Sequence, residues 1–359
     1  MNHNQRAAIL GIQSKEILEE TNSEISLMAY RLSTSFLSDV FRSIFNVEKS
    51  TELIEPRVFT VDDDPGQIVF GRLNPFQIEH LPFAIINDEV LCKNFKLFSD
   101  IDFAVFVDLS LSMLYRWSLT RDVFAKIART GKEVVLVKEQ LCQTKLYALK
   151  YLCCAFLYAA INKSFKTSFV PFSEHVLMEK KSQRDLYFPA FVMNFIDEHF
   201  DGVYKKIEQN ENYGEESGLA NAVTRALKLK KRSIVLFISD FLDDTTETRA
   251  LLFDLKLRHS LLVAVINDPY EVKVPSDKLW RPLNKSWEHT KNIEKNTRRR
   301  IILTEENIQE YNQNAQARRN RLFKFLRDEK IPHIDLVTDQ NQRIPEKLEK
   351  LNLEILQGF

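Results

Sequence analysis

A short polar loop with the pattern Asp-x-Ser-x-Ser follows an apolar stretch of the sequence. Asp108, Ser110 and Ser112 come directly after the run FAVFV at 103–107. All three side chains offer hard oxygen atoms, which suit Mg²⁺, Mn²⁺ or Ca²⁺ better than zinc. A loop that folds over the end of a strand would bring these oxygens to one point. The pattern therefore predicts a site for a hard divalent cation.

A second polar turn follows the apolar run IVLFI at 234–238, and Asp240 is its first acidic residue. If the two apolar runs form neighbouring parallel strands, Asp108 and Asp240 face the same crevice. Two carboxylates in one crevice repel each other unless a cation or a proton lies between them. Because a divalent metal would remove that repulsion, Asp240 is predicted to belong to the same cation site.

The Asp-x-Ser-x-Ser pattern also has a simpler interpretation. Serine is a common N-cap, in which the hydroxyl of Ser110 or Ser112 would accept a hydrogen bond from a backbone amide of a helix. The pattern alone does not separate this cap from a metal site. The strand before the loop, and the second strand that ends in SDFLDD at 239–244, favour the metal site.

The segments around these loops alternate between strand-like and helix-like patterns. Strands that are buried on both faces and separated by helices form a parallel sheet with helices on each side. The sequence therefore predicts an α/β fold with a doubly wound, mainly parallel sheet, whose ligands bind beyond the carboxyl ends of the strands. The expected strands are 103–107, 167–172, 234–238, 261–266 and 334–337, and the expected helices are 146–161, 219–229, 246–257, 305–329 and 345–356.

The first hundred residues have a different pattern. Apolar residues at mixed three-to-four spacing predict a helix within 13–45. Four prolines and several short apolar runs predict strands and loops over 51–97. We expect an amino-terminal helical and β-rich region over 1–100 and a main domain over 101–359, with an insertion at about 114–143.

Composition and motifs exclude several classes of protein. The chain has 50 Lys and Arg against 50 Asp and Glu, and this zero net charge argues against a protein that coats nucleic acid. Its eight glycines form no GxGxxG and no GxxxxGKS or GxxxxGKT loop, so the usual phosphate cradles are missing. Neither an HExxH zinc motif nor a GxSxG nucleophile motif occurs. We therefore do not expect an enzyme.

The sequence also predicts a cellular location. Four cysteines without a CxxC pair favour a reducing compartment over a disulfide framework. The longest apolar stretch, 146–161, contains Lys150 and is shorter than the roughly 20 residues that cross a bilayer. Residues 1–8 lack the apolar segment of a signal peptide. We expect a cytoplasmic protein without a membrane span.

Several stretches of the sequence resemble a known family. DLSLSM at 108–113, with a later strand that ends in Asp240, resembles the metal-ion-dependent adhesion site of von Willebrand factor A domains. More narrowly, the chain resembles the bacterial family named domain of unknown function 58. The stretches that carry this resemblance are ISDFLDD at 238–244, RHSLLVAVINDPYEVKVP at 258–275 and RVFTVDDDPGQIVF at 57–70.

The sequence departs from the family pattern in three places. In the upstream segment, Asp62 replaces the usual Gly and Gly66 the usual Arg, and Val-Phe replaces Asp-Trp, so polar groups have been lost. The threonine that completes the adhesion site in the family is matched best by Ser217, within GEESGL. The insertion at 114–143 is longer than the connection usual in the family.

The resemblance implies a mode of action for the predicted site. Ser110, Ser112 and Ser217 would ligate Mg²⁺, or Mn²⁺ or Ca²⁺, directly, and Asp108 and Asp240 would act chiefly through bound waters. The ion would accept a carboxylate from a partner protein, so the site would serve recognition rather than catalysis. The implied partners are a MoxR-type AAA+ ATPase and an acidic client protein, for which this chain would be an adaptor.

Two other functions remain open. A structural scaffold with an empty adhesion site is favoured if Ser217 is not in position, because the loss of one ligand weakens metal binding. A metal-dependent phosphohydrolase is the weaker alternative, because it needs more converging carboxylates than Asp108, Asp240, Asp243 and Asp244 guarantee.

Overall fold

The computed structural model of the protein describes residues 15–35, 52–58, 91–96, 102–114, 144–163, 165–183, 185–208, 218–230, 232–242, 245–274, 287–288, 300–301 and 305–338. The chain forms two compact units, one of residues 46–100 and one that joins 1–45 to 101–359. In the smaller unit, strand β1 (Glu52–Val58) pairs antiparallel with β2 (Leu91–Lys96), which confirms that strands occur in this region.

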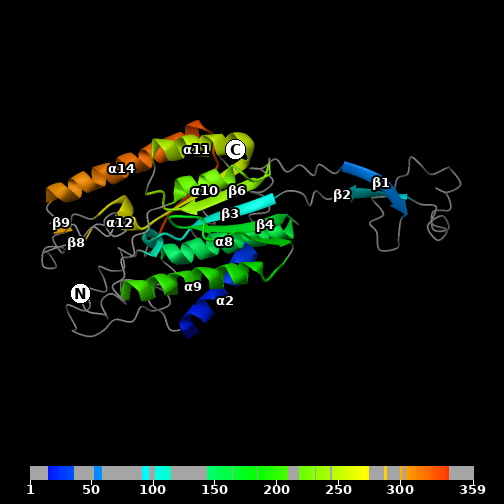
Figure 1. Ribbon diagram of the computed structural model, residues 1–359, viewed down its shortest axis with the longest axis horizontal. Helices are drawn as coiled ribbons and strands as arrows, with labels where there is room; N and C mark the ends of the chain where they lie inside the picture. The colour runs from blue at the N-terminus through cyan, green and yellow to red at the C-terminus, as the bar shows by residue number, and fades with distance from the viewer. Residues whose placement is uncertain are drawn as a thin grey trace. The chain divides into compact units, whose positions relative to one another are not determined.

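The larger unit is built on a six-stranded sheet in which all neighbouring strands are parallel except the last pair. The predicted α/β fold with a mainly parallel sheet is confirmed, and all five expected strands are present (Figure 1). A separate antiparallel pair consists of β8 (Trp287–Glu288) and β9 (Arg300–Ile301). In spatial order the sheet contains β10 (His333–Val337), β7 (Ser260–Asn267), β6 (Ile234–Ser239), β3 (Asp102–Asp108), β4 (Lys166–Phe172) and the antiparallel edge strand β5 (Lys180–Gln183).

Helices cover both faces of this sheet, as a doubly wound fold requires (Figure 1). Four of the five expected helices of the main domain are confirmed, and the fifth, at 345–356, lies outside the described residues. One face of the sheet carries α10 (Leu219–Ala226), α11 (Thr246–Arg258) and α14 (Glu305–Asp328). The opposite face carries α8 (Lys145–Asn162) and α9 (Phe188–Glu208). Helix α2 (Lys15–Ser35) packs against both α8 and α9.

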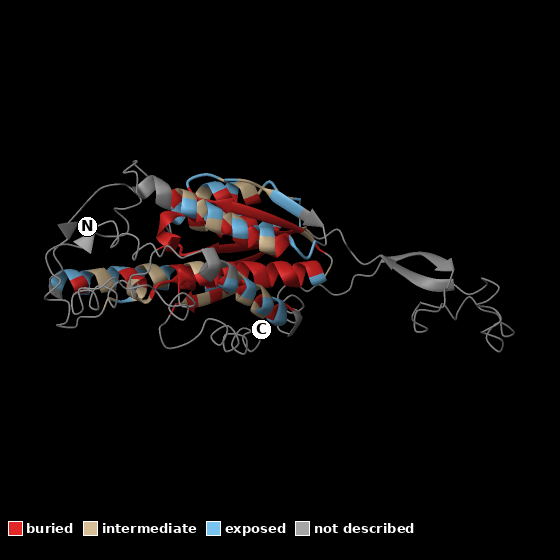
Figure 2. Ribbon diagram, turned by 90° about the horizontal axis from the view of Figure 1, so that it is seen from below, coloured by how far each residue is buried: buried red, intermediate tan, exposed pale blue. Residues whose placement is uncertain are grey.

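The strands lie at the centre of the hydrophobic core (Figure 2). Successive side chains of a strand point to opposite faces of the sheet. In β3, Ala104 and Phe106 therefore pack under α10, α11 and α14, whereas Phe103 and Val105 point toward the face that α8 covers. The ring of Phe106 stacks on Phe237 of β6 at 4.7 Å. Burial of each phenylalanine side chain stabilises the fold by about 1.5–3 kcal/mol, which anchors the strand ends that carry the polar loops.

Helix α8 is buried on nearly all sides, because the sheet covers one side and α2 and α9 cover the other. The helix nevertheless carries two buried lysines. Lys150 forms an ion pair with Asp197 of α9 and donates a 3.1 Å hydrogen bond to Asn22 of α2, so its charge is matched. Lys145 belongs to the site described below. None of the helices in the described part of the chain has the length and apolar content that crossing a bilayer requires.

Several elements of the larger unit were not predicted from the sequence, among them α9 and β5. Along α9, Val192, Ile196, Phe200 and Val203 are buried at intervals of three or four residues, which is a helical signal. Strand β5 has the sequence KKSQ and contains no apolar residue that would indicate a strand. The expected insertion at 114–143 lies, apart from its first residue, outside the described residues.

Candidate functional site

The two predicted polar loops leave the sheet at the same edge. Strands β3 and β6 are parallel neighbours, with Val107 opposite Ile238. Asp108 is the last residue of β3, and Asp240 directly follows β6. The condition set by the sequence, that the two strands be neighbours, is therefore met, and Asp108 and Asp240 lie at the same end of the sheet.

The carboxylate of Asp108 is fully buried and is held from two sides. Its Oδ1 accepts a 2.9 Å hydrogen bond from the backbone amide of Ser110, and its Oδ2 accepts one of 2.6 Å from the hydroxyl of Ser239. The Ser239 oxygen in turn accepts from the amide of Phe241 at 3.1 Å. Ser239 thus joins the two loops, a role that the sequence analysis did not assign to it.

The hydroxyl oxygens of Ser110 and Ser112 lie 3.0 Å apart, and both residues are buried. Ser112 sits in the short 3-10 helix η3 (Leu111–Leu114), which turns its side chain back toward Ser110. An octahedral Mg²⁺ with bonds of 2.0–2.1 Å places adjacent ligands about 3 Å apart. The two hydroxyls form a hydrogen bond with each other, rather than with the backbone amides that an N-cap would bind. The same spacing also fits two neighbouring metal ligands.

The electrostatics at Asp108 also fit a cation. Burial raises the pKa of Asp108 to about 7, and the nearby charge of Asp240 adds to this, while hydrogen bonds from Ser239 and Ser110 oppose it. The ionised carboxylate is therefore disfavoured in the protein on its own. A cation close to Asp108 would favour the charged form.

Asp240 is buried and held by three separate contacts. Its Oδ1 accepts from the amide of Leu242 at 3.2 Å, and its backbone oxygen accepts from Asn267 of β7 at 3.1 Å. Its Oδ2 accepts a 2.9 Å hydrogen bond from Lys145. The next residue, Phe241, has a φ of 51°, a strained value for a bulky side chain, and its ring is buried in the core.

Lys145, the first residue of α8, is completely buried. Its ammonium forms ion pairs with Asp240 at 2.9 Å and with Glu271 at 2.7 Å. Burial lowers the pKa of Lys145, but the charges of Asp240 and Glu271 outweigh this and hold the pKa above its usual value. The lysine is therefore a permanent cation at the Asp240 side of the site, and the sequence analysis did not identify it.

Glu271 connects this ion pair to the turn after β7. The turn begins helix α12 (Pro269–Val272), where Asp268 accepts from the amide of Tyr270 at 2.9 Å and Glu271 accepts from the amide of Asp268 at 2.9 Å. Asp268 and Glu271 thus form a capping box at the start of α12. Burial raises the pKa of Glu271 to about 7, and Asp240 and Asp268 add to this, because one lysine does not neutralise every carboxylate nearby.

Ser217, the predicted third-loop ligand, lies outside the described residues. The next residue, Gly218, is described, and its amide donates a 2.5 Å hydrogen bond to the carbonyl of Ser173, just beyond β4. A Cβ at Gly218 would come closer than 3.0 Å to the carbonyl oxygens of Ser173 and Glu174. Only glycine permits this close approach, which fixes the start of α10 at the carboxyl end of β4.

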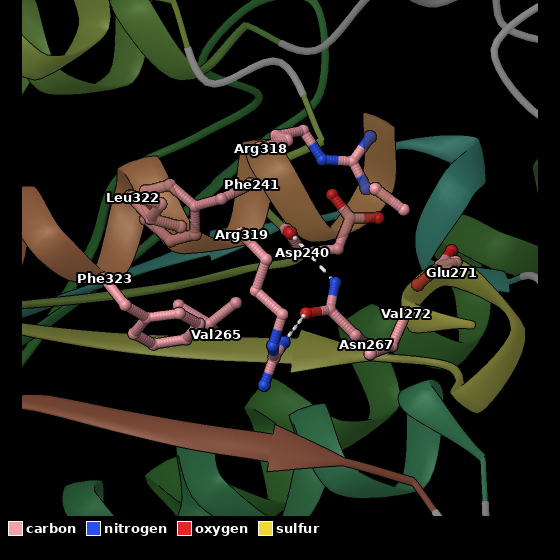
Figure 3. A pocket seen from close by; sticks show the side chains of 11 residues that line it. Asp240, Phe241, Val265, Asn267, Glu271, Val272, Arg318, Arg319, Leu322 and Phe323 are labelled. Atoms are coloured by element: carbon pink, nitrogen blue, oxygen red, sulfur yellow. Dashed lines mark hydrogen bonds between the residues drawn. The ribbon is translucent and has the colours of Figure 1, made fainter. Parts of the chain in front are cut away.

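A small hollow, with room for little more than one water molecule, lies beside Asp240. Figure 3 shows the side chain of Asn267 between Asp240 and Arg319 of α14. Arg319 donates to Asn267 at 2.7 Å and forms an ion pair with Asp335. Arg318, which is half-buried, also lines this hollow. The acidic side of the site is thus bordered by basic residues of α14.

Comparisons with known proteins give little further information. No protein-family model matches the chain, and no curated protein matches it. Among solved structures, it is similar to the conserved hypothetical protein BatB from Bacteroides thetaiotaomicron, with 10% identity and a TM-score of 0.35 over 72% of this chain and 99% of that chain. An aerotolerance-related membrane protein from Bacteroides fragilis has 10% identity and a TM-score of 0.34 over the same shares. Similarity this low does not place the chain in a family.

Proposed function

We propose that this protein is a non-enzymatic adaptor that binds partner proteins through a hard divalent cation, Mg²⁺ or else Mn²⁺ or Ca²⁺. The observation that carries this proposal is the pair of buried hydroxyls of Ser110 and Ser112, 3.0 Å apart beside the buried carboxylate of Asp108. Serine oxygens and a carboxylate are hard ligands, which suit these ions. Asp240 would complete the site from β6, and Ser217 remains the proposed ligand from the third loop.

Each residue would have a defined part in such a site. Ser110 and Ser112 would bind the ion through neutral oxygens, which leave most of its positive charge in place. Asp108 fixes the loop through the amide of Ser110 and is itself oriented by Ser239. When bound, the cation supplies an electrophilic position that accepts a carboxylate from a partner protein.

The donor set favours recognition over hydrolysis. Across the described parts of the chain, no cluster of three or more His, Cys, Asp or Glu side chains is arranged to hold a metal ion. A two-metal phosphohydrolase relies on such clusters, whereas an adhesion site takes part of its ligands from serine hydroxyls. Asp243 and Asp244, the further carboxylates that a phosphohydrolase would use, lie outside the described residues. Among the described residues, the paired serine hydroxyls support a binding site better than a hydrolytic one.

The proposed partners rest on the family resemblance of the sequence. They are a MoxR-type AAA+ ATPase, which would supply the nucleotide hydrolysis for which this chain has no phosphate-binding glycine loop, and a client protein with an acidic residue at its docking surface. A cytoplasmic location is part of the same proposal.

The proposal is tested by calorimetric titration of Mg²⁺ and Mn²⁺ into the wild type and into Ser112→Ala. Ser233→Ala is a matched control, because Ser233 is also buried but precedes β6, at the opposite end of that strand from Ser239. We expect the wild type and the control to bind one ion and Ser112→Ala to lose most of this binding. Equal binding by all three proteins would contradict the proposal.

A second experiment addresses the partner. The MoxR-type ATPase of the same organism is immobilised, and binding of the chain is measured in Mg²⁺ and in EDTA. We expect binding in Mg²⁺ only, and its loss in Ser112→Ala. Binding that is equal in EDTA would favour a metal-independent contact with the ATPase.

A structural scaffold with an empty adhesion site is the second candidate. The observation that favours it is the ion pair of Lys145 with Asp240, which gives the acidic side of the site a cation of its own. A scaffold would show no uptake of Mg²⁺ or Mn²⁺ in the calorimetric titration and would bind its partners equally well in EDTA.

A further inference from the structure

A buried lysine pairs with Asp240, one of the two carboxylates of the proposed metal site. The ammonium of Lys145 lies 2.9 Å from Oδ2 of Asp240 and 2.7 Å from Oε1 of Glu271. Lysine is rarely fully buried unless it is paired, and here the side chain has no exposed surface at all. The residue therefore contributes a charge that solvent does not screen.

The position of this ammonium is fixed from both directions. Lys145 is the first residue of α8, whose N-cap Thr144 accepts a hydrogen bond from the amide of Tyr147 at 3.1 Å. Glu271 is held in the capping box of α12 and presents its other oxygen to the lysine. Helix α8 and the capping box of α12 thus both hold the ammonium of Lys145 beside Asp240.

A divalent ion at the serine hydroxyls would share Asp240 with this ammonium. Two cations that share one carboxylate repel each other, and the low dielectric of a protein interior strengthens the repulsion. At the same time, the ammonium offsets the repulsion between the carboxylates of Asp240 and Glu271, so the two groups are buried together without a metal ion.

We infer that Lys145 is a built-in cation that neutralises the acidic side of the adhesion site, so that the chain folds without a divalent ion and binds one more weakly than it otherwise would. This inference rests on the proposed function, because it assigns Lys145 the role of setting the metal affinity of that same site. Lys145 is a positioning residue in this account and contacts no ligand. The site then takes up metal only where divalent ions are abundant or where a partner carboxylate completes the coordination.

The test is a calorimetric titration of Mg²⁺ into the wild type, Lys145→Met and Lys145→Arg. Methionine keeps most of the apolar stem and removes the charge, whereas arginine keeps the charge. We expect Lys145→Met to bind Mg²⁺ at least about tenfold more tightly, and Lys145→Arg to differ from the wild type by less than about threefold. Lys150→Met is the matched control, because Lys150 is a buried, paired lysine of the same helix that pairs with Asp197 instead, and its Mg²⁺ affinity should equal that of the wild type.

The outcomes separate this inference from the proposed function. If the wild type binds Mg²⁺ and Lys145→Met binds it equally or less tightly, the inference is wrong and the proposed function stands. If only Lys145→Met binds Mg²⁺, the effect of Lys145 on metal affinity is supported, but the proposed function of the wild type fails, because its lysine keeps Mg²⁺ out. If neither binds Mg²⁺, the proposed function fails, and the role of Lys145 in metal affinity fails with it.

A measurement on the wild type covers the case in which Lys145→Met does not fold. With ¹⁵N-labelled lysine, a buried and paired ammonium gives a protected NMR signal, which the Lys145→Arg variant assigns by its loss. We expect this signal in EDTA, and we expect it to shift on addition of Mg²⁺ with the midpoint found by calorimetry. A folded protein whose Lys145 signal does not move while Mg²⁺ binds would overturn the inference.

Discussion

The hydroxyl of Ser239 donates a 2.6 Å hydrogen bond to Oδ2 of Asp108, across 131 residues of sequence. This bond joins the end of β6 to the end of β3, and both residues are buried. The carboxylate is thereby held in one orientation, with Ser110 on its other oxygen. The orientation of Asp108 in the candidate site is therefore set by hydrogen bonds within the protein.

The Ser239→Ala variant tests this organisation. Removal of the Ser239 hydroxyl would leave Oδ2 of Asp108 and the amide of Phe241 without this hydrogen-bond partner, and both groups are buried. We expect the free energy of unfolding to fall by about 1–3 kcal/mol, the usual penalty for an unsatisfied buried polar group. Urea denaturation measures it. The control Ser233→Ala, at the other end of β6, removes a partly buried 2.6 Å hydrogen bond to the carbonyl of Lys230. We expect its free energy of unfolding to fall by less than that of Ser239→Ala.

The Asp108→Asn variant tests the charge at the site through pH. The folded-state pKa of about 7 is above the ordinary 3.8, so protonated Asp108 stabilises the fold below pH 4, and this contribution is lost as the pH rises to about 7. Asparagine mimics the protonated form at every pH. In EDTA, the variant should therefore gain stability relative to the wild type between pH 4 and 7, by on the order of 3–4 kcal/mol.

Urea denaturation at several pH values in EDTA measures this difference. Saturating Mg²⁺ should reduce it, because a cation favours the ionised carboxylate of the wild type. A difference in stability that stays constant from pH 4 to pH 7 would show that Asp108 titrates normally and is not poised for a cation.

Parts of this arrangement were predictable from the sequence, because they depend on local patterns. Apolar runs of five residues identified β3 and β6, and polar residues directly after them identified Asp108 and Asp240. The sequence did not predict that β3 and β6 are neighbours, because strand order depends on contacts between distant segments, and the structure shows that they are.

Other parts depend on distant contacts that no local pattern records. Lys145 is separated from Asp240 by 95 residues and from Glu271 by 126, and in the sequence it is an ordinary lysine at the start of an apolar helix. Glu271 uses one oxygen in the capping box of α12 and the other to bind Lys145, and no local pattern in the sequence indicates this second contact. Ser239 was visible only as part of a polar turn.

The Gly218→Ala variant tests how the start of α10 is fixed. The new methyl group would meet the backbone carbonyls of Ser173 and Glu174, which cannot move aside as a flexible side chain would. We expect a loss of about 1–3 kcal/mol in the free energy of unfolding, together with weaker Mg²⁺ binding, because the adjacent loop is displaced.

Gly202→Ala is the matched control for this substitution. Gly202 lies inside α9, and nothing lies within 4 Å of the place where its Cβ would be. Alanine should stabilise the helix there by about 0.5–1 kcal/mol. If both variants changed stability in the same direction, crowding at Gly218 would not explain the result.

The Lys150→Met variant tests how α2 and α9 are held on α8. Removal of the Lys150 ammonium would leave Asp197 without its ion pair and Asn22 without one of its hydrogen bonds. We expect the free energy of unfolding, measured by thermal and urea denaturation, to fall by about 2–3 kcal/mol. Lys181→Met removes an exposed lysine that pairs with Glu179 at 3.1 Å, and the loss should stay below about 1 kcal/mol. Equal effects would mean that burial does not strengthen the Lys150 pair.

The most direct test of metal binding at this site is thermal unfolding of the wild type, Asp108→Ala and Asp240→Ala in EDTA, Mg²⁺ and Mn²⁺. A ligand that binds only the folded state raises its stability by RT ln(1 + [L]/Kd), or about 2.7 kcal/mol at a concentration of 100 Kd. We expect a clear rise in the melting temperature of the wild type at millimolar metal, and loss of that rise in both variants. An unchanged melting temperature of the wild type, or an equal rise in all three proteins, would contradict the claim that Asp108 and Asp240 form a cation site.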